Sequence, residues 1–148
     1  MRGFTLIELL LVMAIVAIIA ALSAPLTQSF QIGTDLNTVT LSTVQQLRRA
    51  HQQAVAGQAA NDWGVYFDSV GNSLTLFQGS SFATRDVESD TVTTIPESVA
   101  ITTDFSNEII FAQFSGQPSA SGTVILLSDN NETTEISINN LGRIEAAY

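Results

Sequence analysis

The carboxylate of Glu8 stands at the start of a segment in which a charge is costly. An unbroken apolar run follows it from Leu9 to Leu22, and the flanking residues extend this segment to 4–25. A bilayer-spanning helix needs roughly 20 mainly apolar residues, and a carboxylate inside hydrocarbon costs roughly 2.5–3.5 kcal/mol. An acid in this position therefore indicates a functional site.

Glu8 needs a cationic partner, and the apolar run contains no lysine or arginine. Cleavage of the chain after Gly3 would expose an α-amino group at Phe4. A pair between that amine and Glu8 of a neighbouring subunit would set the register of a bundle of like helices, which is the best-attested use of a buried ion pair. We therefore interpret residues 1–3 as a leader peptide and residues 4–25 as a transmembrane and filament-core helix.

The N-terminus also fits a signal peptide or a plain membrane anchor. A secretory signal peptide combines a basic start, an apolar middle and a cleavage site with small residues, and Arg2 and Ala21-Leu22-Ser23 fit this description. A plain membrane anchor would have the same apolar length. Neither of these gives Glu8 a role, so we favour a helix that leaves the membrane and packs against copies of itself.

His51 is the only histidine, and the chain has no cysteine. A zinc site needs three or four ligands, which a lone histidine cannot supply. A Ser-His-Asp site would have to use His51, and no serine has a convincing partner. We expect a packing or surface role for His51, and no catalytic residue, metal or cofactor.

Two acidic segments have carboxylates at spacings that suit a hard cation. Asp86, Glu88 and Asp90 alternate, so in a strand they would share one face, and Asp129-Asn130-Asn131-Glu132 offers oxygen ligands for Ca²⁺. A solvated edge or loop also explains the first segment. A turn of residues that tolerate the left-handed conformation explains the second. We favour the edge and the turn over metal sites.

The charge balance restricts the possible partners. The 148 residues carry a net charge of −9, lysine is absent, and all five basic residues are arginines. From Gln58 onward, twelve acidic residues stand against Arg85 and Arg143, which is a balance of −10. Such a surface repels phosphate backbones, so nucleic-acid binding is disfavoured. We expect Arg143 to pair with a neighbour on its own sheet.

The elements that position these residues follow from the periodicity of the chain. Residues 26–57 are amphipathic at helical spacing, with an apolar stripe of Leu36, Val39, Val44, Leu47, Ala50 and Ala54. One helix is therefore predicted from Phe4, with a kink near Pro25, which lacks a backbone donor, and an end at Gly57. Its second half should pack under a globular head of residues 58–148.

After Gly57 the period changes to two, which is typical of strands. The predicted strands are 63–67, 73–77, 99–103, 108–114, 123–128, 133–138 and 142–146, with weaker candidates at 82–85 and 91–95. A long helix followed by an antiparallel β-sheet head is an α+β fold.

The N-terminal segment resembles the class III signal of type IV pilins and type II secretion pseudopilins. The matching residues are Gly3-Phe4-Thr5-Leu6-Ile7-Glu8-Leu9-Leu10 and Pro25, with the acid five residues after the glycine. The resemblance implies that prepilin peptidase cuts between Gly3 and Phe4 and N-methylates Phe4. It also implies that Glu8 pairs with a neighbour's N-terminus in the filament.

Shorter pieces of the chain are similar to the GspH/FimT subfamily of minor pilins and pseudopilins. They are residues 47–54, the first strand at Trp63, residues 110–118 and residues 136–144. The resemblance implies a position at or near the filament tip, or a role in starting assembly. Some FimT-type pilins take up DNA through a Gly-Arg motif with a second arginine two residues later. Here Gly142-Arg143 is followed by Glu145, which weakens the case for a DNA contact at Arg143.

These observations predict a structural minor pilin or pseudopilin of a bacterial type IV pilus or type II secretion system, and not an enzyme. The expected partners are prepilin peptidase, other pilin subunits, the inner-membrane assembly platform and the membrane itself, through residues 4–25. The expected location is the inner membrane, in a single pass with the head in the periplasm or outside, and then the filament. The alternatives are a DNA-binding competence pilin and a secreted binding domain behind an ordinary signal peptide.

Overall fold

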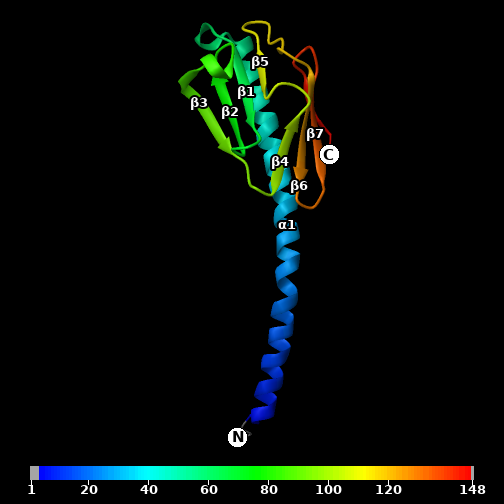
Figure 1. Ribbon diagram of the computed structural model, residues 1–148. Coiled ribbons are helices and arrows are strands. Elements are labelled where there is room, and N and C mark those ends of the chain that lie inside the picture. Colours follow the sequence, from blue (N-terminus) through cyan, green and yellow to red (C-terminus); the bar gives the residue numbers. More distant parts are fainter. Residues whose placement is uncertain (1–3, 148) are drawn as a thin grey trace.

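A long helix carries a head of β-strands at its C-terminal end (Figure 1). The computed structural model describes residues 4–147, and the side chains of residues 22–31 are outside the description. Helix α1 (Leu6–Val55) has 50 residues, which at about 1.5 Å per residue spans roughly 75 Å. Its N-terminal part extends away from the head and its C-terminal part packs against it. This arrangement confirms the predicted α+β fold.

Local capping explains both ends of α1. Thr5 has an extended backbone and caps the first turn with its side-chain oxygen. After the last turn, Gly57 adopts a φ of 62°, the left-handed conformation that commonly follows a helix C-terminus. The helix therefore lies within the predicted range of 4–57 and ends slightly inside it.

Pro25 lies inside α1. Proline has no N–H to donate to the preceding turn, so it weakens a helix at that point. The helix nevertheless continues through this residue, which means that the proline does not end it. The side chain of Pro25 is outside the description, and the kink expected there stays a prediction.

The head contains two four-stranded antiparallel sheets in the described part of the chain. The first sheet has the order β3-β2-β1-β5, with β1 (Trp63–Asp68), β2 (Ser73–Gln78), β3 (Asp86–Thr94) and β5 (Glu108–Phe111). The second sheet has the order β4-β6-β7-β8, with β4 (Val99–Thr103), β6 (Gly122–Ser128), β7 (Thr133–Ile138) and β8 (Ile144–Ala147). Two short 3-10 helices accompany them, η1 (Gln58–Ala60) and η2 (Phe82–Thr84).

Strand register gathers apolar side chains on the inner faces of both sheets. In the first sheet Val65 is paired with Leu76, and in the second Val124 is paired with Ile136. All four side chains are buried. Because side chains alternate along a strand, a shift of one residue would turn these groups toward solvent, so burial specifies the register.

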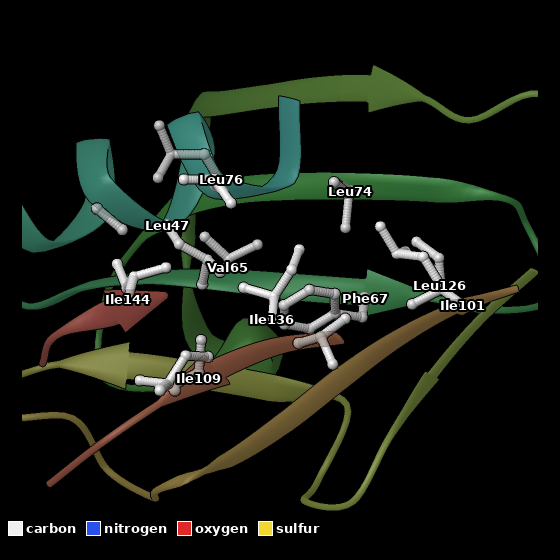
Figure 2. Close-up of a cluster of buried hydrophobic side chains, with 14 of the residues drawn as sticks. Leu47, Val65, Phe67, Leu74, Leu76, Ile101, Ile109, Leu126, Ile136 and Ile144 are labelled. Atoms are coloured by element: carbon white, nitrogen blue, oxygen red, sulfur yellow. The ribbon is translucent and has the colours of Figure 1, made fainter. Parts of the chain in front are cut away.

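The apolar stripe of α1 covers the inner faces of the two sheets. Its six predicted members are all buried, namely Leu36, Val39, Val44, Leu47, Ala50 and Ala54. Figure 2 shows Leu47 of α1 in one cluster with Val65 of β1, Ile136 of β7 and Ile144 of β8. The second half of α1 is therefore part of the core of the head.

Residues 82–84 form η2 and Arg85 is its C-cap, so the weak strand predicted for 82–85 is absent. The Phe82 ring stacks on Tyr66 with 3.9 Å between ring centroids, and the Arg85 guanidinium lies 3.7 Å from the Phe82 centroid. The Phe82 N–H donates to a carboxylate oxygen of Glu108 at 2.8 Å. The strand prediction is wrong here because partners distant in sequence outweigh the local β propensity of the segment.

Strand β3 begins earlier than predicted, at Asp86 rather than at residue 91. Its pairing with β2 shifts register, since Leu76 is opposite Thr91 while Gln78 is opposite Asp86. Two positions of β2 are therefore matched by five positions of β3, and the extra residues of β3 form a bulge. Periodicity alone does not indicate such a segment, because alternation is interrupted there.

Strand β5 ends at Phe111, three residues earlier than predicted. The next three N–H groups leave the sheet and find other acceptors: Ala112 donates to Gln117 O, Gln113 to Asp62 Oδ1, and Phe114 to Ala54 O. Strand β8 likewise begins at Ile144 rather than at 142, because Gly142 has a φ of 77° and belongs to a turn.

Replacement of Leu47 by alanine tests whether α1 is part of the core. We expect Leu47→Ala to lower the free energy of unfolding by about 2–5 kcal/mol, because the side chain is fully buried and leaves a cavity. The measurement is urea unfolding of the full chain in detergent micelles, followed by fluorescence of Trp63, the only tryptophan. The matched control is Leu41→Ala on the same helix, where the leucine is 54% exposed. Equal effects of the two substitutions would contradict this core.

Candidate functional site

The N-terminal part of α1 exposes apolar side chains on every face. All residues from Phe4 to Ala21 are exposed, including the large apolar residues Leu6, Ile7, Leu9, Leu10, Leu11, Val12, Met13, Ile15, Val16, Ile18 and Ile19. A helix that is apolar all round needs a covering of lipid or of other protein. Among the described residues, no helix combines the length and the hydropathy required to cross a membrane.

The first turn of α1 is closed by Thr5 and Glu8. The Glu8 N–H donates to Thr5 Oγ1 at 3.3 Å and to Thr5 O at 3.1 Å. Thr-x-x-Glu is the pattern of a capping box, and an acid in the first turn also interacts favourably with the helix dipole. The sequence analysis missed this role, although the threonine three residues before the glutamate was its signal.

The capping contact leaves the carboxylate of Glu8 accessible. The residue is exposed, and the bond to Thr5 uses the backbone N–H of Glu8 and not its side chain. Phe4 precedes the helix and is 82% exposed, while Gly3 lies outside the described residues. Glu8, the expected register residue, and Phe4, the expected new N-terminus, therefore lie at the same end of the molecule, away from the head.

His51 is packed against two glycine turns at the other end of α1. It is half-buried, and its ring meets the Phe111 ring edge to face, with 5.4 Å between centroids. A Cβ on Gly142 would lie 2.7 Å from His51 Cδ2, and one on Gly116 would lie 2.6 Å from His51 Nε2. Such contacts fit the packing role expected for this histidine.

A groove of about 760 Å³ lies beside His51, between α1 and β8. Helix α1 lines it with Arg48, His51 and Gln52, which follow one another at helical spacing, and β8 lines the opposite wall. Arg143, the possible DNA contact, also lines it. Its guanidinium pairs with Glu145 at 2.6 Å, with both side chains more than half exposed. Glu145 lies two residues later on β8, whereas Arg143 itself precedes that strand. The contribution of Arg48 was missed, because only the fold brings it next to Arg143.

The alternating acids of β3 do not converge. Asp90 accepts from Arg85 Nε at 2.8 Å, whereas Asp86 and Glu88 are exposed. Within residues 4–147 as described, no group of three His, Cys, Asp or Glu side chains is placed to hold a metal ion. The interpretation as a strand edge in contact with solvent agrees with Asp86 and Glu88, whereas the side chain of Asp90 is only 11% exposed and faces Arg85.

The segment from Asp129 to Glu132 is a turn between β6 and β7. Asn131 has a φ of 60°, the left-handed conformation that asparagine tolerates. The Asn131 N–H donates to Ser128 O at 2.9 Å, and the Glu132 N–H donates to Ser128 Oγ at 3.2 Å. These bonds explain the composition of the segment without a metal.

The N-terminal segment of the chain matches a known family model. Residues 1–24 match the family model described as the prokaryotic N-terminal methylation motif. No curated protein sequence matches the chain significantly.

The chain is also similar to proteins of known structure. Two solved structures of the minor pseudopilin EpsH from the type 2 secretion system of Vibrio cholerae are similar to this chain at 15% sequence identity. The first has a TM-score of 0.60 and covers 76% of this chain and 96% of that chain. The second has a TM-score of 0.57 and covers 76% and 93% respectively. At this identity the likeness establishes the fold.

Substitution of Gly142 tests the packing of the turns against His51. We expect Gly142→Ala to lower the free energy of unfolding by about 1–3 kcal/mol, because φ is positive and the new Cβ would lie 2.8 Å from Gly116 O. The matched control is Gly33→Ala within α1, where the nearest atom to a new Cβ is Glu132 Oε2 at 3.8 Å. That change should stabilise the chain by about 0.5–1 kcal/mol. Urea unfolding measures both, and a neutral Gly142→Ala would refute the packing.

Proposed function

We propose that this chain is a minor pilin or pseudopilin, a structural and non-enzymatic subunit of a bacterial type IV pilus or type II secretion system. Its N-terminal methylation motif and its fold support membership of the type IV pilin and pseudopilin superfamily. The observation that carries the proposal is the exposed apolar helix with a single carboxylate at its free end. A helix with that surface is built to be covered by lipid and then by like helices.

Processing by prepilin peptidase is the first step of the proposed mechanism. The peptidase cuts between Gly3 and Phe4 and N-methylates Phe4, as the matched motif suggests. Phe4 supports this step by its position, because it precedes α1 and its side chain is exposed. Cleavage there removes residues 1–3 and leaves a new amine beside the first turn of the helix.

The inner membrane holds the subunit before assembly. Residues 4–25 lie in the bilayer in a single pass, and the head of residues 58–148 lies in the periplasm or outside. The exposed apolar side chains of α1 support this location, because their transfer from water into the lipid tails is favourable. The assembly platform then transfers the helix from the lipid into the filament, and residues 26–57 keep the head attached to it.

Glu8 sets the register of the helix within the filament. Its carboxylate pairs with the α-amino group of Phe4 in a neighbouring subunit, in surroundings made apolar by the rest of the helix. The structure supports this role because the carboxylate is exposed while the backbone of Glu8 is already capped by Thr5. Removal of one member of such a buried pair leaves the other uncompensated, so the role depends on charge.

DNA binding at Arg143 is not favoured. Arg143 is paired with Glu145, and from Gln58 onward the chain has a balance of −10, with twelve acidic residues and two arginines. To contact Arg143, a DNA phosphate would have to displace the Glu145 carboxylate while the other acidic residues of the head repel it. The competence-pilin alternative therefore has no observation that supports it over an assembly role.

The native N-terminus tests the proposed processing. We expect the protein extracted from membranes to begin at N-methylated Phe4, as measured by intact mass and N-terminal sequencing. Gly3→Val should leave residues 1–3 attached, because the peptidase motif is lost, whereas Gly33→Ala should be processed normally. A native N-terminus near Ser23 or Ala24 would instead indicate a signal peptide and a secreted domain, and would overturn the proposal.

The charge of Glu8 is tested separately from its capping role by Glu8→Gln. Glutamine also completes a capping box, so α1 should still begin at the same residue. We expect normal processing and at least about a tenfold loss of the subunit from sheared filaments or from crosslinked assemblies, because the register pair is lost. The matched control is Glu97→Gln on the exposed surface of the head. Normal incorporation of the Glu8→Gln subunit would contradict the register role.

A further inference from the structure

The backbone changes from extended to helical at Thr5. This residue has a φ of −82° and a ψ of 153°, which is extended, and α1 begins directly after it. The Thr5 C=O accepts from the N–H groups of Glu8 at 3.1 Å and Leu9 at 3.2 Å, while Thr5 Oγ1 accepts from the Glu8 N–H at 3.3 Å. A carbonyl and a side chain that both serve the first turn define an N-cap, so the side chain of Thr5 sets where the helix starts.

No neighbouring side chain can replace Thr5 in this role. Within residues 1–22, Thr5 is the only serine, threonine, asparagine or aspartate, the types whose short side chains cap a helix. The N–H groups of a first turn have no partner inside the helix, and in lipid or detergent no water supplies one. If the cap were lost, added helical residues would carry these groups toward the aqueous surface. Loss of the cap therefore favours a helix that extends over Phe4.

This boundary lies beside the bond that the proposed processing breaks. Phe4 is outside α1 and 82% exposed, so the residue that would carry the new amine is not helical. The match of residues 1–24 to the N-terminal methylation motif independently indicates chemistry at this end of the chain. Proteases bind the residues around the scissile bond in extended form, and a bond held in a helix is cut only when that helix opens. Cleavage between Gly3 and Phe4 therefore requires α1 to stop short of Phe4.

We infer that Thr5 is a positioning residue for this processing, because by ending α1 it keeps the Gly3–Phe4 bond available to prepilin peptidase in extended backbone. The inference rests on the proposed function and assigns a further residue to the cleavage proposed there. Thr5 takes no part in the bond changes. The peptidase adds water across the peptide bond, which leaves a carboxyl group on Gly3 and an amine on Phe4. Thr5 acts through the fraction of molecules whose helix is open at Phe4.

Two other roles for Thr5 lead to different results. In one, the peptidase reads the shape of the threonine side chain; in the other, Thr5 stabilises the helix and has no effect on cleavage. Capping needs a hydrogen-bond acceptor and not a particular shape. Valine has the shape of threonine without the acceptor, whereas asparagine has a different shape and caps at least as well. Substitution of Thr5 by these two residues therefore separates the three roles.

Cleavage of the full chain in detergent micelles by purified prepilin peptidase tests the inference. The reaction is followed by intact mass, as the loss of residues 1–3. We expect Thr5→Val to lower kcat/KM about fivefold, which is the typical weight of an N-cap in the balance between an open and an extended helix end. The change should lie in KM and not in kcat, because fewer molecules are competent to bind but each is cut at the same rate.

Conservative variants and a matched control complete the cleavage experiment. Thr5→Ser and Thr5→Asn should be cut within about twofold of the native sequence, because both side chains cap. The control is Thr38→Val, which makes the same change on an exposed residue of α1 whose hydroxyl donates to Thr34 O at 2.9 Å. It should be cut like the native sequence. Fast cleavage of Thr5→Val, or slow cleavage of Thr5→Asn, would overturn the inference.

The start of the helix is measured in the same variants by backbone NMR chemical shifts at Phe4. We expect Phe4 to be extended in the native sequence and in Thr5→Asn, and to become partly helical in Thr5→Val. Slow cleavage of Thr5→Val with Phe4 still extended would show direct reading of the side chain and would overturn the inference. Absence of cleavage in the native sequence would overturn the proposed processing as well, whereas cleavage that ignores the cap would overturn this inference alone.

Discussion

The burial of the apolar stripe of α1 is the constraint on which the rest of the structure depends. Each sheet of the head has four strands and one apolar face, and both faces are covered by the same helix. Leu47, Ala50 and Ala54 are completely buried there, so the helix is as much a part of the core as any strand. A force applied to the helix is consequently transmitted to the head, because the two cannot separate without exposing the core to water.

The same helix has a different surface in its first half. There the apolar side chains point in all directions and none is covered within the described chain, whereas in the second half they form a stripe. One continuous element thus joins a folded head to a surface that needs partners. Glu8 lies at the free end of this element, where its N–H helps to start the helix and its carboxylate stays exposed.

Backbone groups that are distant in sequence determine the detail of the head. Phe114 has a φ of 63° and its N–H donates to Ala54 O of α1, which turns the chain away from β5. Gly116 and Gly142 bring two loops against His51 at distances that leave no room for a Cβ. Segment 82–85 follows the same principle. Phe82 stacks on Tyr66 and its N–H donates to Glu108, and these contacts outweigh the β propensity of the segment.

The sequence by itself determined the helix, its apolar stripe, most of the strands and the special position of Glu8, because periodicity and the cost of a charge among apolar residues are local properties. Only the tertiary structure decided where β3 begins and β5 ends, and that Arg48 and Arg143 line one groove. The physical reason is that these features depend on hydrogen bonds and contacts made in the folded chain, most of them between segments far apart in sequence. Neither spacing nor composition specifies which of those segments will meet.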